Sequence, residues 1–201
     1  MQDNTTGTKS KIVDSALRLF AAEGYDKVTM RDIAKSVGIL SGSIYGHFKS
    51  KESILEACYS FYLEHKHDNR LKKEEYLPIL KNGTKEDIVR AINYSFPNDI
   101  LEKMISALLI MYSRMYIDDT AMDMYADEIN SSLNYMDEFF NAGIEIGRFK
   151  KFNVRTVSLI YLSSRLFAAH SVTLKPEQKD QWREAELDMF NELIKIIPFT
   201  R

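Results

Sequence analysis

Residues 24–52 read GYDKVTMRDIAKSVGILSGSIYGHFKSKE, and this stretch predicts short helices separated by tight turns. Gly24 ends a first helix, expected over residues 10–23, where apolar side chains recur at helical spacing. Thr29-Met30-Arg31-Asp32 has the form of a capping box, so a second helix begins at Thr29 and ends at Gly38. A third helix is expected from Ser41 to Phe48, and a fourth begins near Ser50.

A third helix this short cannot be stable alone, and its apolar residues show how it is held. Ile44 and Phe48 are four residues apart, so both face the first two helices. The opposite side of the helix is then free to enter the major groove of DNA. Three short helices with a glycine-containing turn between the second and third form a helix-turn-helix arrangement.

The rest of the chain also predicts helices. No segment alternates apolar and polar residues with a period of two, so we expect an all-α fold without a sheet. Later helices are expected over residues 99–116, 118–143 or 118–147, 153–174 and 176–197. We divide the chain into a DNA-binding domain, residues 1–52, and a second helical domain, residues 53–201.

Charge is unevenly distributed along the 201 residues. The chain has 27 Lys and Arg against 29 Asp and Glu, a net charge of −2. Residues 1–51 hold eight basic and five acidic side chains, so they carry +3 and the remainder carries −5. The near-neutral total excludes a protein that coats nucleic acid through bulk charge, but the positive segment coincides with the helix-turn-helix.

The sequence predicts a cytoplasmic protein that does not enter the membrane. The lone cysteine, Cys58, excludes an internal disulfide framework and fits a reducing compartment. Residues 1–8 are polar and lack the apolar core of a signal peptide. The longest apolar stretch, residues 104–111, is far shorter than the ~20 residues that span a bilayer.

Motifs for catalysis or metal binding are missing from the sequence. The sequence contains no nucleophile elbow, glycine-rich phosphate loop or HExxH pattern, so we expect neither enzymatic activity nor a cofactor. His65 and His67, with Asp68, could suggest a metal site. Residues two apart point about 200° from each other on a helix, so the two histidines do not share one ion easily.

The residues of the first stretch resemble the DNA-binding domain of TetR-family transcriptional repressors. The resemblance covers roughly residues 10–55 and rests on the order and spacing of five short segments. These are Gly24-Tyr25, Thr29-Met30-Arg31-Asp32-Ile33-Ala34, Gly38, Ser43-Ile44-Tyr45 and Phe48-Lys49-Ser50-Lys51-Glu52. Residues 141–149 also resemble the glycine-containing junction before the family's last two helices.

The resemblance implies a fold, partners and a mode of action. It implies about nine helices, a homodimer that binds a palindromic double-stranded DNA operator, and a small-molecule effector that releases the operator. It places Ser41, Ser43 and Tyr45 against DNA, with His47 and Lys49 on the backbone. The complete predicted DNA-binding set is Thr29, Arg31, Ser41, Gly42, Ser43, Tyr45, Gly46, His47, Lys49 and Lys51.

Several of these positions have individual expectations. Thr29 would place its hydroxyl or N–H near a phosphate, Gly42 would permit close approach, and Lys51 would pair with phosphate. Leu40 stands where the family usually has a Ser or Thr cap, so we expect Ser41 to cap the third helix. Gly46 stands where the family usually has a large side chain, which predicts either an unusually close approach to a base or weaker discrimination there.

The last two predicted helices are apolar over a wide arc, which indicates partners on two sides and favours a homodimer bundle. The predicted dimer interface comprises Leu159, Leu162, Leu166, Trp182, Met189, Leu193 and Ile196.

Met and Tyr on the middle helices suit a lipophilic ligand, although such residues are also typical of a plain core. The predicted ligand-binding residues are Met104, Leu108, Met111, Tyr112, Met115, Tyr125, Phe139, Phe167 and His170. The alternative is a DNA-bound adaptor of the same fold, controlled by a protein partner.

Overall fold

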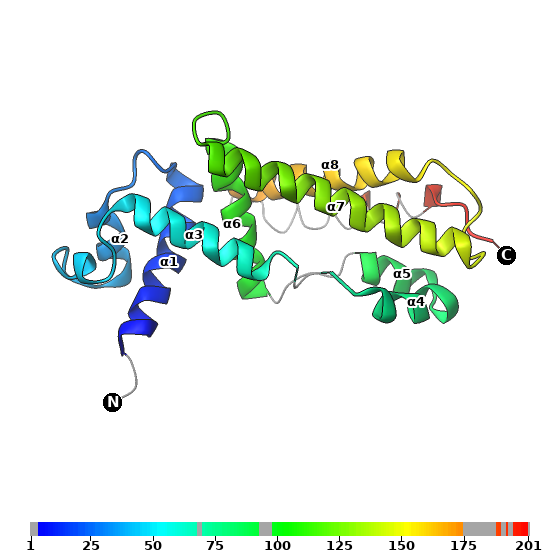
Figure 1. The fold of residues 1–201 in the computed structure, drawn as a ribbon, viewed down its shortest axis with the longest axis horizontal. Helices are drawn as coiled ribbons and strands as arrows, with labels where there is room; N and C mark the ends of the chain where they lie inside the picture. The colour runs from blue at the N-terminus through cyan, green and yellow to red at the C-terminus, as the bar shows by residue number, and fades with distance from the viewer. Residues whose placement is uncertain are drawn as a thin grey trace. The chain divides into compact units, whose positions relative to one another are not determined.

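The protein is all-α in this computed structural model, as the sequence predicts (Figure 1). The structure describes the whole chain except residues 1–3, 68–69, 93–97, 175–187, 190–191, 193–194 and 201, and describes only the backbone of 4–6, 98–99 and 167–174. Within the described residues there is no strand, and one isolated bridge joins Phe149 and Phe199. The helices are α1 Asn4–Glu23, α2 Met30–Val37, the 3₁₀ helix η1 Ser43–Gly46, α3 Lys51–His65, α4 Lys73–Asn82, α5 Lys85–Ile92, α6 Asn98–Arg114, α7 Asp119–Glu145 and α8 Val154–Leu174.

Most predicted helix ends agree with these bounds. Helix α1 begins at Asn4, whereas the prediction placed its start near Ser10. The first turns were missed because their residues are polar and show no apolar stripe. Asp118 accepts a hydrogen bond from the Ala121 N–H and so caps α7, the long helix expected from this point. The last predicted helix, residues 176–197, falls largely outside the described residues.

The chain packs into two compact units. Unit 1 contains residues 1–67 and 97–125, and unit 2 contains residues 68–96 and 126–201. The boundary predicted between residues 52 and 53 lies inside unit 1, at the start of α3. Helices α3 and α6 both pack on α1, so unit 1 is larger than the predicted DNA-binding domain.

Unit 1 has α1 at its centre, in contact with α2, α3 and α6. The predicted stripe of α1 is buried, since Ile12, Ala16 and Phe20 are almost fully excluded from solvent. Lys103 of α6 forms an ion pair with Asp14 of α1 at 2.9 Å. A well-packed framework therefore supports the short elements α2 and η1.

Unit 2 contains residues 141–149, the second segment that resembles the family, and its packing shows why this segment contains glycines. A Cβ on Gly143 would lie 2.2 Å from the ring of Phe149, so only glycine lets this ring pack on α7. Gly147 has φ 74°, which turns the chain back after α7. Arg148 then donates to the Gly83 carbonyl at 2.7 Å, and the Phe149 ring contacts Phe199 near the end of the chain.

The part of the chain that the structure describes shows neither a membrane-spanning helix nor a metal site. None of its described helices combines the length and apolar character needed to cross a bilayer. No group of three or more His, Cys, Asp or Glu side chains lies close enough to hold a metal ion among the described residues. His65 instead contacts the Phe61 carbonyl through Nδ1 and stacks on the Phe61 ring.

Candidate nucleic-acid interface

Helix α2 begins with the predicted capping box. Thr29 Oγ1 accepts a hydrogen bond from the Asp32 N–H at 3.2 Å, and the Thr29 N–H donates to Asp32 Oδ2 at 2.9 Å. The Thr29 hydroxyl also donates to that carboxylate oxygen at 2.6 Å. These bonds from Thr29 lower the pKa of Asp32, so the carboxylate stays ionised.

The capping box changes the expected role of Thr29. Both donors of this residue, the hydroxyl and the N–H, are directed to Asp32. A phosphate at this helix end would therefore meet the positive end of the α2 dipole rather than an unused Thr29 donor. The predicted contact of Thr29 with phosphate stays a prediction, and the structure assigns the residue a definite role in ordering the first turn.

The turn after α2 directs the chain into the recognition element. Gly38 has φ 79°, a conformation that favours glycine, and its N–H donates to carbonyls of the last turn of α2. The Ile39 N–H donates to the Ala34 carbonyl at 3.0 Å, which completes the helix end. Ser43 N–H then donates to the Leu40 carbonyl at 2.8 Å, and η1 begins.

The recognition element is shorter and tighter than predicted. An α-helix was expected over Ser41–Phe48, but the structure has a single 3₁₀ turn, Ser43–Gly46. The expected cap at Ser41 is also wrong, because Gly42 occupies the N-cap position and no side chain caps the element. Glycines at both ends and a length of one turn leave too little helix propensity for a regular α-helix.

The two predicted anchors of this element are confirmed. Ile44 is completely buried and Phe48 is 5% exposed, so they fix the segment to unit 1 from one side. Burial of each such side chain stabilises the fold by about 1.5–3 kcal/mol. The element keeps its position through these two contacts rather than through its own hydrogen bonds.

Most of the remaining residues of the segment are exposed to solvent. Tyr45 is 57% exposed and offers a flat ring with a hydroxyl at its tip. Of the ten residues predicted to contact DNA, His47 and Lys51 are half-buried, and the other eight are exposed: Thr29, Arg31, Ser41, Gly42, Ser43, Tyr45, Gly46 and Lys49. His47 Nδ1 is buried without a hydrogen-bond partner. Most of the predicted set is therefore accessible to solvent.

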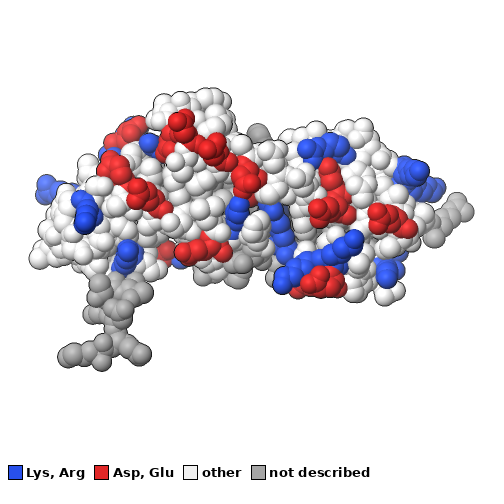
Figure 2. Space-filling model, viewed as in Figure 1, with Lys and Arg blue, Asp and Glu red and all other residues white. Residues whose placement is uncertain are grey.

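Surface charge agrees with this placement. Around η1, at the left of Figure 2, this face of the molecule shows basic and uncharged atoms, whereas acidic atoms gather further along unit 1. Where basic and uncharged atoms face outward on this side, DNA phosphates can approach without repulsion.

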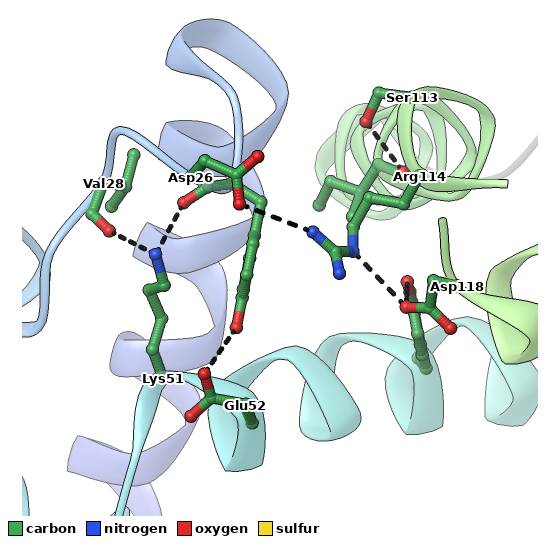
Figure 3. Close-up of polar contacts among 10 residues, drawn as sticks. Asp26, Val28, Lys51, Glu52, Ser113, Arg114 and Asp118 are labelled. Atoms are coloured by element: carbon green, nitrogen blue, oxygen red, sulfur yellow. Dashed lines mark hydrogen bonds and ion pairs between the residues drawn. The ribbon is translucent and has the colours of Figure 1, made fainter. Parts of the chain in front are cut away.

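Lys51 has an internal role that the sequence did not predict. Its Nζ donates to the Tyr25 carbonyl at 2.9 Å and to the Val28 carbonyl at 3.0 Å, and it lies 4.2 Å from the centroid of the Tyr25 ring (Figure 3). Two of its three N–H donors therefore hold the turn between α1 and α2. One donor remains for the phosphate contact that the resemblance implies.

Arg114 approaches the same tyrosine from α6. Its Cζ is 4.2 Å from the Tyr25 ring centroid, and Figure 3 shows Lys51 and Arg114 extending from opposite sides of the view. Arg114 Nε donates to Asp118 Oδ2 at 3.3 Å, while Nη1 lies 3.9 Å from Asp26 Oδ1. We call this group, Tyr25, Asp26, Lys51, Glu52, Tyr59, Arg114 and Asp118, the Tyr25 cluster.

The pKa values of three groups in the Tyr25 cluster are shifted, upward for the two tyrosines and downward for Asp118. Burial, together with the Glu52 carboxylate that accepts its hydrogen bond, raises the pKa of Tyr25 to about 12. Burial and the neighbouring Asp118 also raise the pKa of Tyr59, whose hydroxyl donates to Asp118 at 3.1 Å. Burial alone would raise the pKa of Asp118, but hydrogen bonds from Ala121, Tyr59 and Arg114 outweigh it, and the pKa is lowered.

The Tyr25 cluster was missed at the sequence level for a physical reason. Tyr25 and Lys51 were recognised only as parts of a local pattern, and Arg114 lies almost ninety positions further along the chain. Only the packing of α6 on α1 brings this arginine to the turn. The sequence offered one signal for this cluster, an arginine at the end of an apolar helix followed by Asp118. That pattern alone does not show which residues the arginine contacts.

The predicted ligand-binding residues are divided between the two units. Met104 and Met111 are buried in unit 1, where the rings of Tyr112 and Tyr125 lie 5.6 Å apart. Phe139 is fully buried in the core of unit 2. Leu108 and Met115 are half-buried, while the side chains of Phe167 and His170 lie outside the described residues.

The predicted dimer residues on α8 are incompletely covered. Leu159 is 46% exposed, and Leu162 and Leu166 are half-buried. Near the chain end, Ile196 is 57% exposed and Met189 is half-buried. Trp182 and Leu193 lie outside the described residues.

Comparison with known proteins identifies the family of the helix-turn-helix segment. Residues 12–58 match the model of the bacterial regulatory proteins of the tetR family, a segment that includes all ten predicted DNA-contacting residues. This segment of the chain is a DNA-binding domain of the TetR type. The family resemblance given by the helix-turn-helix residues is therefore confirmed.

Curated relatives of this chain are transcriptional regulators rather than enzymes. IcaR of Staphylococcus epidermidis, the negative regulator of the biofilm operon icaADBC, is 28% identical over 133 residues, which are 63% of this chain and 65% of that protein. IcaR of Staphylococcus aureus strain Newman is 56% identical over 48 residues, 24% of this chain and 26% of that protein. The matched part thus spans less than two thirds of either relative.

Solved structures extend the likeness of fold over the whole chain. A protein from Saccharomonospora viridis in complex with choline has a TM-score of 0.68 at 19% identity, covering 98% of this chain and 100% of that one. A TetR-family transcriptional regulator from Cytophaga hutchinsonii has a TM-score of 0.66 at 13% identity, with both chains covered completely. At these identities the comparison establishes the fold.

Proposed function

We propose that this protein is a transcriptional repressor that binds a palindromic operator as a homodimer and leaves it when a small lipophilic effector binds. The observation that carries the proposal is the recognition segment, which is anchored by Ile44 and Phe48 and, apart from the half-buried His47, exposes its other residues from Ser41 to Lys49. In a dimer, two such segments would read successive major grooves about 34–36 Å apart.

Homodimer formation is supported by the apolar side chains on α8. Leu159 and Ile160 are 46% and 43% exposed, and neighbouring residues on the same helix are half-buried. A helix that is apolar over a wide arc is stabilised by covering that arc with a second copy. Light scattering of the purified protein should give twice the chain mass, and a Leu159→Asp variant should give a larger monomer fraction.

The DNA-binding test is selection from random duplexes with the purified protein. We expect an enriched palindrome, and Tyr45→Ala should reduce binding to it by the loss of base or backbone contacts at the centre of the recognition segment. Tyr116→Ala is a matched control, because Tyr116 is also an exposed tyrosine of unit 1 but lies between α6 and α7. Failure to enrich any sequence at low salt would contradict the proposed function.

Control by a protein partner is the second candidate, and a specific surface favours it. Tyr116 and Ile117 are 79% and 71% exposed in the turn between α6 and α7, and Met122 of α7 is also exposed. A solvent-exposed apolar patch is typical of a docking surface. Titration of the protein–DNA complex with lipophilic compounds separates the candidates, because release by a compound alone supports effector control.

A further inference from the structure

Lys9 lies on α1, outside the segment from which the DNA-contacting residues were predicted. Its Nζ lies 5.3 Å from the centroid of the Phe48 ring, over the ring face. Phe48 is the anchor at the end of the recognition segment and directly precedes the exposed Lys49. Tertiary packing therefore brings a second lysine to the end of the segment where Lys49 stands.

The position of Lys9 on α1 explains why its ammonium is directed there. Lys9 continues the stripe of Ile12, Ala16 and Phe20, the face of α1 that is buried in unit 1. The aliphatic stem follows this apolar face, while the side chain as a whole remains exposed. The Phe48 ring face attracts the ammonium and limits its positions.

The charge of Lys9 is available to a ligand. No carboxylate in the described part of the chain forms an ion pair with it, whereas Asp14, the nearest acidic residue of α1, is paired with Lys103 of α6. An exposed cation beside a DNA-reading segment lowers the free energy of binding by displacing counterions from phosphate.

We propose that Lys9 is a phosphate-binding residue of the DNA interface and that it contacts the same stretch of backbone as Lys49. This inference rests on the proposed function, since it extends the recognition surface to the first turns of α1. Lys9 contacts phosphate rather than bases, so it adds affinity equally to all sequences.

Lys11 provides a matched control on the same helix. It is also exposed and carries the same charge, but two residues along an α-helix correspond to a rotation of about 200°. Lys11 therefore points away from Phe48. Replacing either lysine by Met removes one charge and keeps a long flexible side chain.

The experiment measures the dissociation constant for the selected operator over a range of salt concentrations. For Lys9→Met we expect affinity to fall roughly tenfold or more at 0.1 M salt, and the slope of log K against log salt to flatten by about 0.9 for each protomer bound. Lys11→Met should resemble the unchanged protein, and Lys9→Arg should retain both the affinity and the slope.

Each other outcome overturns a distinct statement. If Lys9→Met and Lys11→Met give the same affinity and slope, the assignment of Lys9 is wrong while the proposed function stands. If Lys9→Met loses affinity with an unchanged slope, or melts at a lower temperature than Lys11→Met, the role of Lys9 is structural and the proposal fails. If the unchanged protein binds no selected DNA, the proposed function fails first and the inference with it.

Discussion

The recognition segment and the Tyr25 cluster lie in the same unit but satisfy their polar groups in opposite ways. Between Ser41 and Lys49 only Ile44 and Phe48 are buried, and no side chain caps the 3₁₀ turn. In the Tyr25 cluster, by contrast, lysine, arginine, tyrosine and carboxylate groups bond to one another or to backbone carbonyls. The difference separates a surface kept open for a ligand from a framework that holds this surface in place.

Two lysines show the same contrast within three positions of the sequence. Lys49 is exposed, while the ammonium of Lys51 is held by the Tyr25 and Val28 carbonyls. The two residues are of the same type and belong to the same local motif, yet Lys51 binds the fold whereas Lys49 remains exposed. Substitutions in the Tyr25 cluster should therefore lower stability, and substitutions in the recognition segment should lower DNA affinity.

Lys51→Met has the largest expected effect on stability. The variant leaves two carbonyls of the α1–α2 turn without their charged donor, and a hydrogen bond to a charged group contributes about 1.5–3 kcal/mol. We expect the free energy of unfolding in urea to fall by about 2 kcal/mol, and affinity for DNA to fall as well.

Lys49→Met is the matched comparison for Lys51→Met. An exposed lysine contributes within about 0.5 kcal/mol to stability, so this variant should lose affinity with an almost unchanged unfolding midpoint. Equal destabilisation by both substitutions would contradict the separate roles of the two lysines.

Asp118→Asn tests the Tyr25 cluster through pH. Hydrogen bonds hold the pKa of Asp118 below its usual 3.8 in the folded protein. A lowered pKa contributes stability above the unfolded pKa, and this contribution is lost as the pH falls through the folded value. We expect the variant to be about 1 kcal/mol less stable at pH 7, because Asn still caps α7 but loses the charge attraction to Arg114.

The pH profile is the decisive measurement for Asp118. The difference in unfolding free energy between the unchanged protein and Asp118→Asn should shrink below about pH 4, where the carboxylate becomes protonated. A difference that stays constant down to pH 2 would show that the ionised carboxylate of Asp118 is not what stabilises the cluster.

Gly46→Ala has the smallest expected effect, and it should raise stability, whereas Lys51→Met and Asp118→Asn should lower it. A Cβ at this position meets no atom within 4 Å, so the variant should gain up to ~1 kcal/mol from the less flexible unfolded chain. We expect operator affinity to fall, because the added methyl group stands on the surface that approaches the bases. Unchanged affinity and footprint would exclude a close approach of the backbone to DNA at Gly46.

Much of unit 1 could be predicted because its signals are local. The Thr29–Asp32 box, the glycine at position 38 and the helix start near Ser50 each depend on a few neighbouring residues, and the structure contains all three. The anchors Ile44 and Phe48 followed from helical spacing. Their burial survives the change to a 3₁₀ turn, because both still face the core of unit 1.

Errors arose where local preferences were weak. Gly42 and Gly46 do not favour an α-helix, so packing decided the form of the recognition element and displaced the expected cap from Ser41. The candidate DNA-binding residues came from local patterns, and their contacts with DNA stay predictions. Lys9 was not among them, since no local pattern connects it to Phe48.

The sequence by itself determined the helical fold, the capped ends of α2 and α3, and the family of the DNA-reading segment, because these depend on residue types a few positions apart. Tertiary structure alone decided which lysines serve the fold and which remain free for a ligand. Contacts such as Lys9 with Phe48 or Arg114 with Tyr25 join residues about forty to ninety positions apart, and only packing of the helices brings these side chains together.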